Sequence, residues 1–195
     1  MKIMSDNSVR CAWCEGDAAD EHYHDNQWGV PIHDDRLWFE FLTLEGAQAG
    51  LSWRTIINKR EGYQQLFKQF DINKVANMTD DELQEILKNP AIIRNRLKVY
   101  STRNNAQQML KVQDEFGSFD QYIWAYVDNK PIQNNFVSLK DLPATTDISD
   151  AMCKDLKKRG FKFIGSTICY ALMQASGMVN DHETSCFRYK ECSKM

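Results

Sequence analysis

The sequence predicts an all-α protein that forms one domain over residues 1–195, and three observations support this prediction. Apolar residues recur at three- and four-residue spacing along most of the chain, whereas no segment alternates apolar and polar residues for more than a few positions. Residues that cap helices precede several of these segments, and glycines follow some of them. With 43% hydrophobic residues, the chain can bury one sizeable core.

Capping residues locate the helices of the first half. Asp34 can cap a helix whose apolar positions continue to Leu44. A second helical segment is expected over residues 52–67. Thr79 and Glu82 have the spacing of a capping box, which indicates that a short helix begins there.

The helices of the second half follow from the same signals. A long helix with Leu97 on its apolar face is expected to reach Gly117, and Ser118 can cap the next helix. A lysine-rich helix is expected to start near residue 147 and to end at glycine 160. The last major helix is expected over residues 166–176.

Charge and hydropathy restrict the class of protein. The 24 Lys and Arg residues against 27 Asp and Glu residues give a formal charge of −3, which excludes a protein that coats DNA through bulk charge. The first residues contain no apolar segment typical of a signal peptide, and polar residues interrupt the longest uncharged stretch, 163–180. We expect a cytoplasmic, monomeric protein without a membrane segment, with a disordered tail over 1–10 and a flexible tail over 187–195.

Cysteine and histidine spacing indicates a metal site. His182 and Cys186 lie four positions apart, which fits one half of a tetrahedral zinc site, and Cys11 and His24 can supply the other half. Four protein ligands would make the site structural, and it would join the two ends of the chain. The alternative is that these are ordinary buried cysteines and surface histidines. Other residues also compete for the ligand positions: Cys14, His22 and Cys192.

Cys11 and Cys14 also form a C-x-x-C motif, which is found in thiol redox proteins. That motif normally opens a helix directly after a strand. No strand pattern precedes it here, so metal ligation is the stronger alternative.

Glu45 is the carboxylate that stands out, because it shares a helix face with apolar and aromatic residues. It is expected either to line a pocket or to pair with a neighbouring cation. Trp53 follows eight residues later, and three more aromatic residues crowd the N-terminal segment: Trp13, Tyr23 and Trp28. Together they could form a cage for a flat, cationic or base-like ligand, or they could be simple core aromatics.

A glycine-bracketed connection follows the lysine-rich helix, and its candidate phosphate-contacting residues are Arg159, Gly160, Lys162, Gly165 and Ser166. Backbone N–H groups at the start of a helix can hold a phosphate without reading sequence. This pattern is typical of helix-hairpin-helix DNA binding. The alternative is a basic helix end that is simply solvated.

Five segments occur together in an order that covers nearly the whole chain: 11–13, 23–31, 44–53, 157–165 and 180–182. With these segments the sequence resembles the 3-methyladenine DNA glycosylase I family of bacterial alkylation repair. The resemblance implies a helix-hairpin-helix DNA glycosylase-like fold. It also implies excision of 3-methyladenine from alkylated duplex DNA. The sequence places no lysine to form a Schiff base with the sugar, so we expect no strand cleavage. A non-catalytic, zinc-stabilised DNA-binding or damage-sensing protein is the alternative.

The resemblance also implies roles for individual residues. It places one structural zinc ion on four ligands: Cys11, His24, His182 and Cys186. It implies a base pocket in which Glu45 is the catalytic residue and the aromatic residues bind the substrate: Tyr23, Trp53, Trp13 and Trp28.

Two positions depart from the family pattern. Asp20 stands where the family often has a second tyrosine, and Gln27 stands where it often has glutamate. Cys14 has no part in the pattern. The family lacks the catalytic aspartate that many of its relatives have after the hairpin, and Asp181 is therefore not assigned that role.

Overall fold

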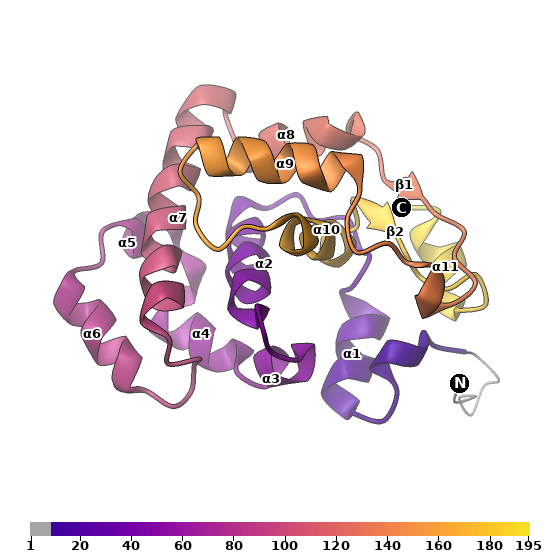
Figure 1. Ribbon diagram of the computed structural model, residues 1–195, viewed down its shortest axis with the longest axis horizontal. Helices are drawn as coiled ribbons and strands as arrows, with labels where there is room; N and C mark the ends of the chain where they lie inside the picture. Colours follow the sequence, from indigo (N-terminus) through magenta and orange to yellow (C-terminus); the bar gives the residue numbers. More distant parts are fainter. Residues whose placement is uncertain (1–8) are drawn as a thin grey trace.

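The computed structural model describes residues 9–195, and the part of the expected N-terminal tail formed by residues 1–8 lies outside the described residues. The described chain is mostly helical (Figure 1). Its first α-helices are α1 (Ala18–Asn26), α2 (Asp35–Gln48), α3 (Trp53–Ile57), α4 (Arg60–Leu66), α5 (Ile72–Ala76) and α6 (Asp80–Lys88). The remaining α-helices are α7 (Arg96–Phe116), α8 (Phe119–Trp124), α9 (Asp147–Lys158), α10 (Ser166–Ala175) and α11 (Phe187–Cys192).

Short elements complete the described chain. Its 3-10 helices are η1 (Ala12–Cys14), η2 (Lys68–Phe70), η3 (Ala125–Val127) and η4 (Leu139–Asp141). The expectation of an all-α fold needs one correction, because β1 (Ile132–Gln133) and β2 (Val179–Asn180) pair in parallel. Two-residue strands are too short to leave an alternating pattern in the sequence.

Side-chain caps fix most helix starts. Asp34 accepts a hydrogen bond from the Leu37 amide, and Thr79 and Glu82 form the expected capping box. Helix α9 begins at Asp147, as expected, and Thr146 is its N-cap. Each cap satisfies a backbone donor that the helix itself leaves unpaired.

Helix α2 lies at the centre of the fold, between α7 and α10 (Figure 1). All ten residues from 38 to 47 are buried, because α3, α7, α8 and α10 all pack against this helix. A helix that is covered on every side places any polar residue it carries in the protein interior. This burial determines the environment of Glu45.

Two expectations about helices were wrong in detail. The segment 52–67 is divided into α3 and α4 at residues 58–59. Leu97 is 68% exposed, and α7 instead packs through a stripe that includes Val99, Ala106 and Met109. Leu97 fits the spacing of the apolar residues before it, but α7 begins only at Arg96, so those residues do not continue its stripe.

The two ends of the described chain are joined. The Phe187 amide donates a hydrogen bond to the Val9 carbonyl (2.9 Å), and the Arg10 guanidinium forms a salt bridge with Asp25 (2.6 Å). The expected flexible tail over 187–195 is therefore corrected, because residues 187–192 form α11 and Cys192 is buried. A contact with a distant segment orders a terminus that sequence alone leaves free.

Within residues 9–195, no helix is both long and apolar enough to cross a membrane.

Candidate functional site

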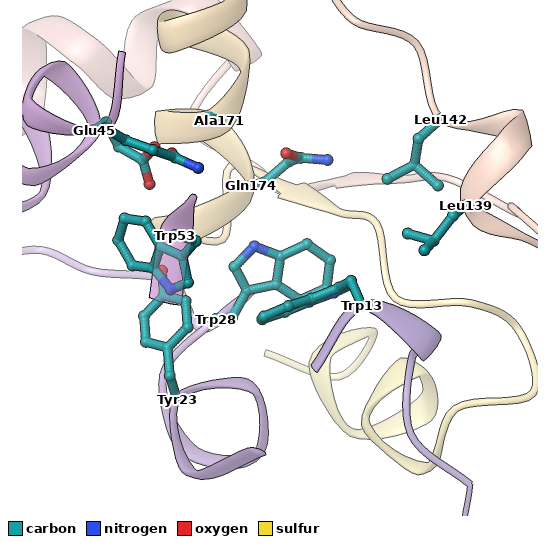
Figure 2. Close-up of a pocket in the computed structure, with 10 residues that line it drawn as sticks. Trp13, Tyr23, Trp28, Glu45, Trp53, Leu139, Leu142, Ala171 and Gln174 are labelled. Atoms are coloured by element: carbon teal, nitrogen blue, oxygen red, sulfur yellow. The ribbon is translucent and has the colours of Figure 1, made fainter. Parts of the chain in front are cut away.

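A cavity of about 230 Å³ opens beside the C-terminal half of α2 (Figure 2). Its walls come from η1, α1, α2, α3, η4 and α10 and from the loop after α1. Its lining residues are Trp13, Tyr23, Trp28, Glu45, Gln48, Trp53, Leu139, Leu142, Ala171 and Gln174. The structure thus brings together all five pocket residues that the sequence predicted.

The Glu45 carboxyl group is buried, with 5% of the residue exposed. Burial raises the pKa of Glu45 to about 8, because desolvation disfavours the charged carboxylate. A carboxyl group with a pKa near neutrality can exchange a proton under physiological conditions.

Aromatic rings form one side of the cavity. The Tyr23 and Trp53 rings lie 5.0 Å apart between centroids, and the Trp13 and Trp28 rings lie 5.2 Å apart at 69°. Such faces suit a flat, positively charged ligand, because the ring quadrupole attracts a cation.

Three polar atoms of this aromatic wall are buried without a hydrogen-bond partner in the described chain: Trp13 Nε1, Tyr23 Oη and Trp53 Nε1. Burial, followed by the nearby Glu45 carboxylate, raises the pKa of Tyr23 well above its usual value, so its hydroxyl keeps its proton. Unpartnered buried donors cost free energy, and a bound ligand with acceptor atoms can satisfy them.

Sequence reasoning missed five lining residues. Three of them could have been found from helix spacing. Gln48 lies one helical turn after Glu45, and Gln174 lies one helical turn after Ala171. Leu139 and Leu142 lie in and next to η4, and no periodic pattern marked them as cavity residues.

A second cluster joins the two ends of the chain: Cys11, His24, His182 and Cys186. All four residues are buried, and one ligand atom from each lies within 4.8 Å of the others. Cys186 Sγ lies 3.4 Å from His24 Nε2 and 3.6 Å from His182 Nδ1. The structure therefore assembles the four residues that spacing suggested and that the family resemblance implied, and this cluster could hold a metal ion.

The ring nitrogens on the far side of both histidines are also bonded. His24 Nδ1 lies 2.8 Å from Asp25 Oδ1, and His182 Nε2 lies 3.1 Å from the Trp28 carbonyl oxygen. These contacts fix the ring orientations, so that His24 Nε2 and His182 Nδ1 face the two sulfur atoms.

The chemistry of the four groups fits a borderline-soft divalent cation. The hydrogen bond between the two thiols lowers the pKa of Cys186 and raises the pKa of Cys11. Burial lowers the pKa of His182, which favours the neutral imidazole that ligates metals. Two sulfur and two nitrogen donors are a tetrahedral ligand set.

The remaining cysteines are free thiols in the described chain, and all are buried. Burial raises the pKa of Cys14 to about 12, which opposes the reactive thiolate that a redox motif needs.

The cluster and the cavity share a wall. The Trp28 ring lies 4.6 Å from the His182 ring, and the Trp13 ring lies 5.6 Å from the His24 ring. Two cavity tryptophans therefore pack directly on the candidate ligands.

The connection between α9 and α10 packs against α2, where a Cβ on Gly46 would lie 3.4 Å from the Phe163 carbonyl. Gly160 adopts a φ of +93°, a conformation that favours glycine. The Gly160 and Lys162 amides donate to the Lys157 carbonyl and the Asn105 side chain, respectively.

The five candidate phosphate-contacting residues are not equally available. Arg159 forms salt bridges with Glu115 (2.7 Å) and Asp155 (3.3 Å), and the Ser166 hydroxyl donates to Asp150. In contrast, the space beside Gly165 is open, and Lys162 is exposed.

The two residues that depart from the family pattern, Asp20 and Gln27, are each hydrogen-bonded to an arginine. Asp20 is buried and accepts a hydrogen bond from Arg54 (2.9 Å), while Gln27 accepts one from Arg60. Both pairs connect α1, or the residue that follows it, to the α3–α4 segment.

A family model described as methyladenine glycosylase matches residues 13–189. DNA-3-methyladenine glycosylase 1 of Escherichia coli (strain K12) is 44% identical over 92% of this chain and 96% of its own length. A crystal structure of 3-methyladenine DNA glycosylase I matches 92% of this chain and 98% of its own with a TM-score of 0.90 and 47% identity. A variant 3-methyladenine DNA glycosylase I in complex with 3-methyladenine matches with a TM-score of 0.89, 35% identity and coverage of 91% and 96%.

Proposed function

Since the chain belongs to the methyladenine glycosylase family, we propose that it is a DNA-3-methyladenine glycosylase that hydrolyses the bond between the damaged base and its sugar. The observation that carries this proposal is a desolvated carboxyl group, Glu45, in an aromatic cavity with unpartnered donors. A base can enter the cavity only after its nucleotide has left the base stack of the duplex. Extruding an alkylated base costs less free energy than extruding a normal one.

Methylation at N3 gives the base a positive charge, and the base leaves as a neutral molecule. The bond to the sugar is therefore already weak, and little acid catalysis is needed. Stacking on Trp53 and its neighbours contributes about 0.5–2 kcal/mol more for a cation than for neutral adenine. Glu45 accepts a hydrogen bond from the exocyclic amine and stabilises the charged base, and it can position the attacking water.

A structural zinc ion held by Cys11, His24, His182 and Cys186 fits the donor set. Four protein ligands leave no open position, so the ion supplies stability rather than chemistry. Its role is to hold Trp13 and Trp28 in the cavity wall through the two histidines.

The α9–α10 unit acts as a helix-hairpin-helix that holds duplex DNA by its phosphates. The open N-terminus of α10 at Gly165 and the exposed Lys162 support this assignment, whereas Arg159 acts mainly by bracing α9 against Glu115. Exposed lysines 154, 157 and 158 surround the same connection. The protein acts as a monomer in the cytoplasm, where buried free thiols stay reduced.

The test is incubation of the purified protein with methylated duplex DNA, followed by chromatography of the released bases. We expect free 3-methyladenine without strand cleavage, and about 100-fold slower release by Glu45→Gln. The matched control is Glu40→Gln, which alters a buried carboxylate of the same helix that pairs with Arg60. The Glu40→Gln protein, once shown to be folded, should release 3-methyladenine at the wild-type rate. Binding of methylated DNA without base release would instead support the damage-sensing alternative.

A further inference from the structure

Asp181 is buried beside the cavity and accepts three hydrogen bonds. Its donors are the Tyr170 hydroxyl (2.6 Å), Gln174 Nε2 (2.8 Å) and Asn134 Nδ2 (2.7 Å). Only 2% of Asp181 is exposed, so these bonds replace its hydration. The mechanism above assigns no role to this carboxylate.

This arrangement fixes which end of the Gln174 amide faces the cavity. A carboxylate can only accept hydrogen bonds, so the NH₂ group of Gln174 must point to Asp181 and the carbonyl oxygen must point away. Figure 2 shows the Gln174 amide oxygen on the side of Glu45 and the nitrogen on the opposite side. The Gly29 amide also donates to the Gln174 backbone carbonyl (3.1 Å), which ties this turn of α10 to the cavity wall.

The side-chain acceptors that line the cavity therefore include the Glu45 carboxyl and the Gln174 amide oxygen. Building on the proposed function, we propose that Gln174 is a specificity-determining residue, which accepts a hydrogen bond from the exocyclic amine of the base together with Glu45. Asp181 is its positioning residue. An amine carries two hydrogens and can donate to both acceptors.

The consequence is discrimination between the two purines at C6. 3-Methylguanine has a carbonyl oxygen where 3-methyladenine has the amine. That oxygen would face the Gln174 oxygen, which leaves the Gln174 acceptor unpaired and repels the base. If the Gln174 amide were reversed, it would offer a donor to the same carbonyl.

The first variant is Gln174→Leu, which removes the acceptor but keeps much of the volume. We expect the kcat/KM for release of 3-methyladenine to fall about tenfold, as for the loss of one hydrogen bond to a charged donor. Release of 3-methylguanine should not fall, so the ratio of the two bases changes about tenfold. An unchanged ratio would overturn the proposal, whatever happens to the overall rate.

The second variant, Asp181→Asn, tests the positioning role. An asparagine can donate to Gln174 Oε1, so the amide can reverse, and the ratio of released bases should again shift toward 3-methylguanine. This shift should disappear in the Gln174→Leu background, because Asp181 acts through Gln174. An equal effect of Asp181→Asn in both backgrounds would show that Asp181 is only structural.

Tyr170→Phe is the matched control, because it removes another donor to Asp181 without touching the Gln174 amide. It should leave the base ratio unchanged. Equilibrium binding of the two free bases, followed by tryptophan fluorescence, gives the same comparison without the reaction. Failure of the wild-type protein to release either base would contradict the proposed function, whereas equal loss of affinity for both free bases in Gln174→Leu would contradict this inference.

Discussion

The candidate metal-ligand cluster and the cavity lie side by side, and Trp13 and Trp28 contact both of them. The two regions differ in whether their buried polar atoms have hydrogen-bond partners. In the cluster, both ring nitrogens of His24 and both ring nitrogens of His182 have partners inside the protein. In the cavity, the polar atoms of three aromatic residues have no partner in the described chain: Trp13, Tyr23 and Trp53.

The difference shows how a fold separates stability from recognition. A group whose hydrogen bonds are complete inside the protein stabilises the native state and has nothing left for a ligand. A buried group without a partner destabilises the empty protein but gains when a ligand arrives. We expect substitutions in the cluster to affect unfolding most, and substitutions in the cavity to affect activity most.

The largest effect should follow loss of a cluster residue. If the cluster holds zinc as proposed, Cys186→Ala should lower the free energy of unfolding by at least about 4 kcal/mol, because it removes one of the four ligands that join the chain ends. Urea unfolding and metal content measure the change. Cys14→Ala removes another buried thiol, whose Sγ lies 3.2 Å from the Cys11 carbonyl oxygen, and it should cost about 1 kcal/mol without changing the metal content. Equal losses in the two variants would remove the special role of the cluster.

The second-largest effect is a dependence of the free energy of unfolding on pH, which arises from Glu45 in the cavity. Burial raises the pKa of folded Glu45 to about 8, so between about pH 5 and pH 8 the folded protein binds a proton that the unfolded chain has lost. The free energy of unfolding should therefore fall as the pH rises through this range, by on the order of 4 kcal/mol in total. Glu45→Gln should remove this contribution and be the more stable protein at pH 9. Urea unfolding of both proteins at pH 5.5 and pH 9 provides the test, and parallel pH profiles would disprove it.

Two tryptophans separate activity from stability. Trp53→Leu is expected to slow release of 3-methyladenine about tenfold by removing a stacking face, with a small effect on unfolding. Trp38 is fully buried and its indole donates to Asp120 (2.9 Å), so Trp38→Leu should destabilise the protein by a few kcal/mol. Its folded fraction should still release the base. A Trp53→Leu protein that is as active as wild type would remove Trp53 from the substrate site.

The smallest effect concerns the Tyr23 hydroxyl. Because this group is buried without a partner, Tyr23→Phe should leave stability unchanged or raise it by up to about 1 kcal/mol. The same change should weaken base binding several-fold. Thermal unfolding and base release on one preparation measure both quantities. A marked loss of stability would mean that the hydroxyl is hydrogen-bonded within the protein. The cavity would then not differ from the cluster in this respect.

Much of the site was predictable because its parts are local in sequence or chemically unusual. Spacing alone suggested the four ligands, and an acidic residue on an apolar helix face marked Glu45. The resemblance to a family then decided between alternatives that spacing left open. Leu139 and Leu142 could not be predicted, because they lie in and next to a short 3-10 helix whose position is not reflected in any hydrophobic periodicity of the sequence. The flexible C-terminal tail was wrong because α11 is ordered by contacts such as that of Phe187 with Val9, and sequence periodicity carries no information about such distant pairing.

The bond between His182 and the Trp28 carbonyl spans 154 positions of the chain. During synthesis on the ribosome, the segment that contains Trp28 emerges many seconds before the histidine that supports it. A nascent chain that lacks His182 therefore cannot hold the aromatic wall in place. We expect the protein to be able to release a damaged base only after translation has passed Cys186.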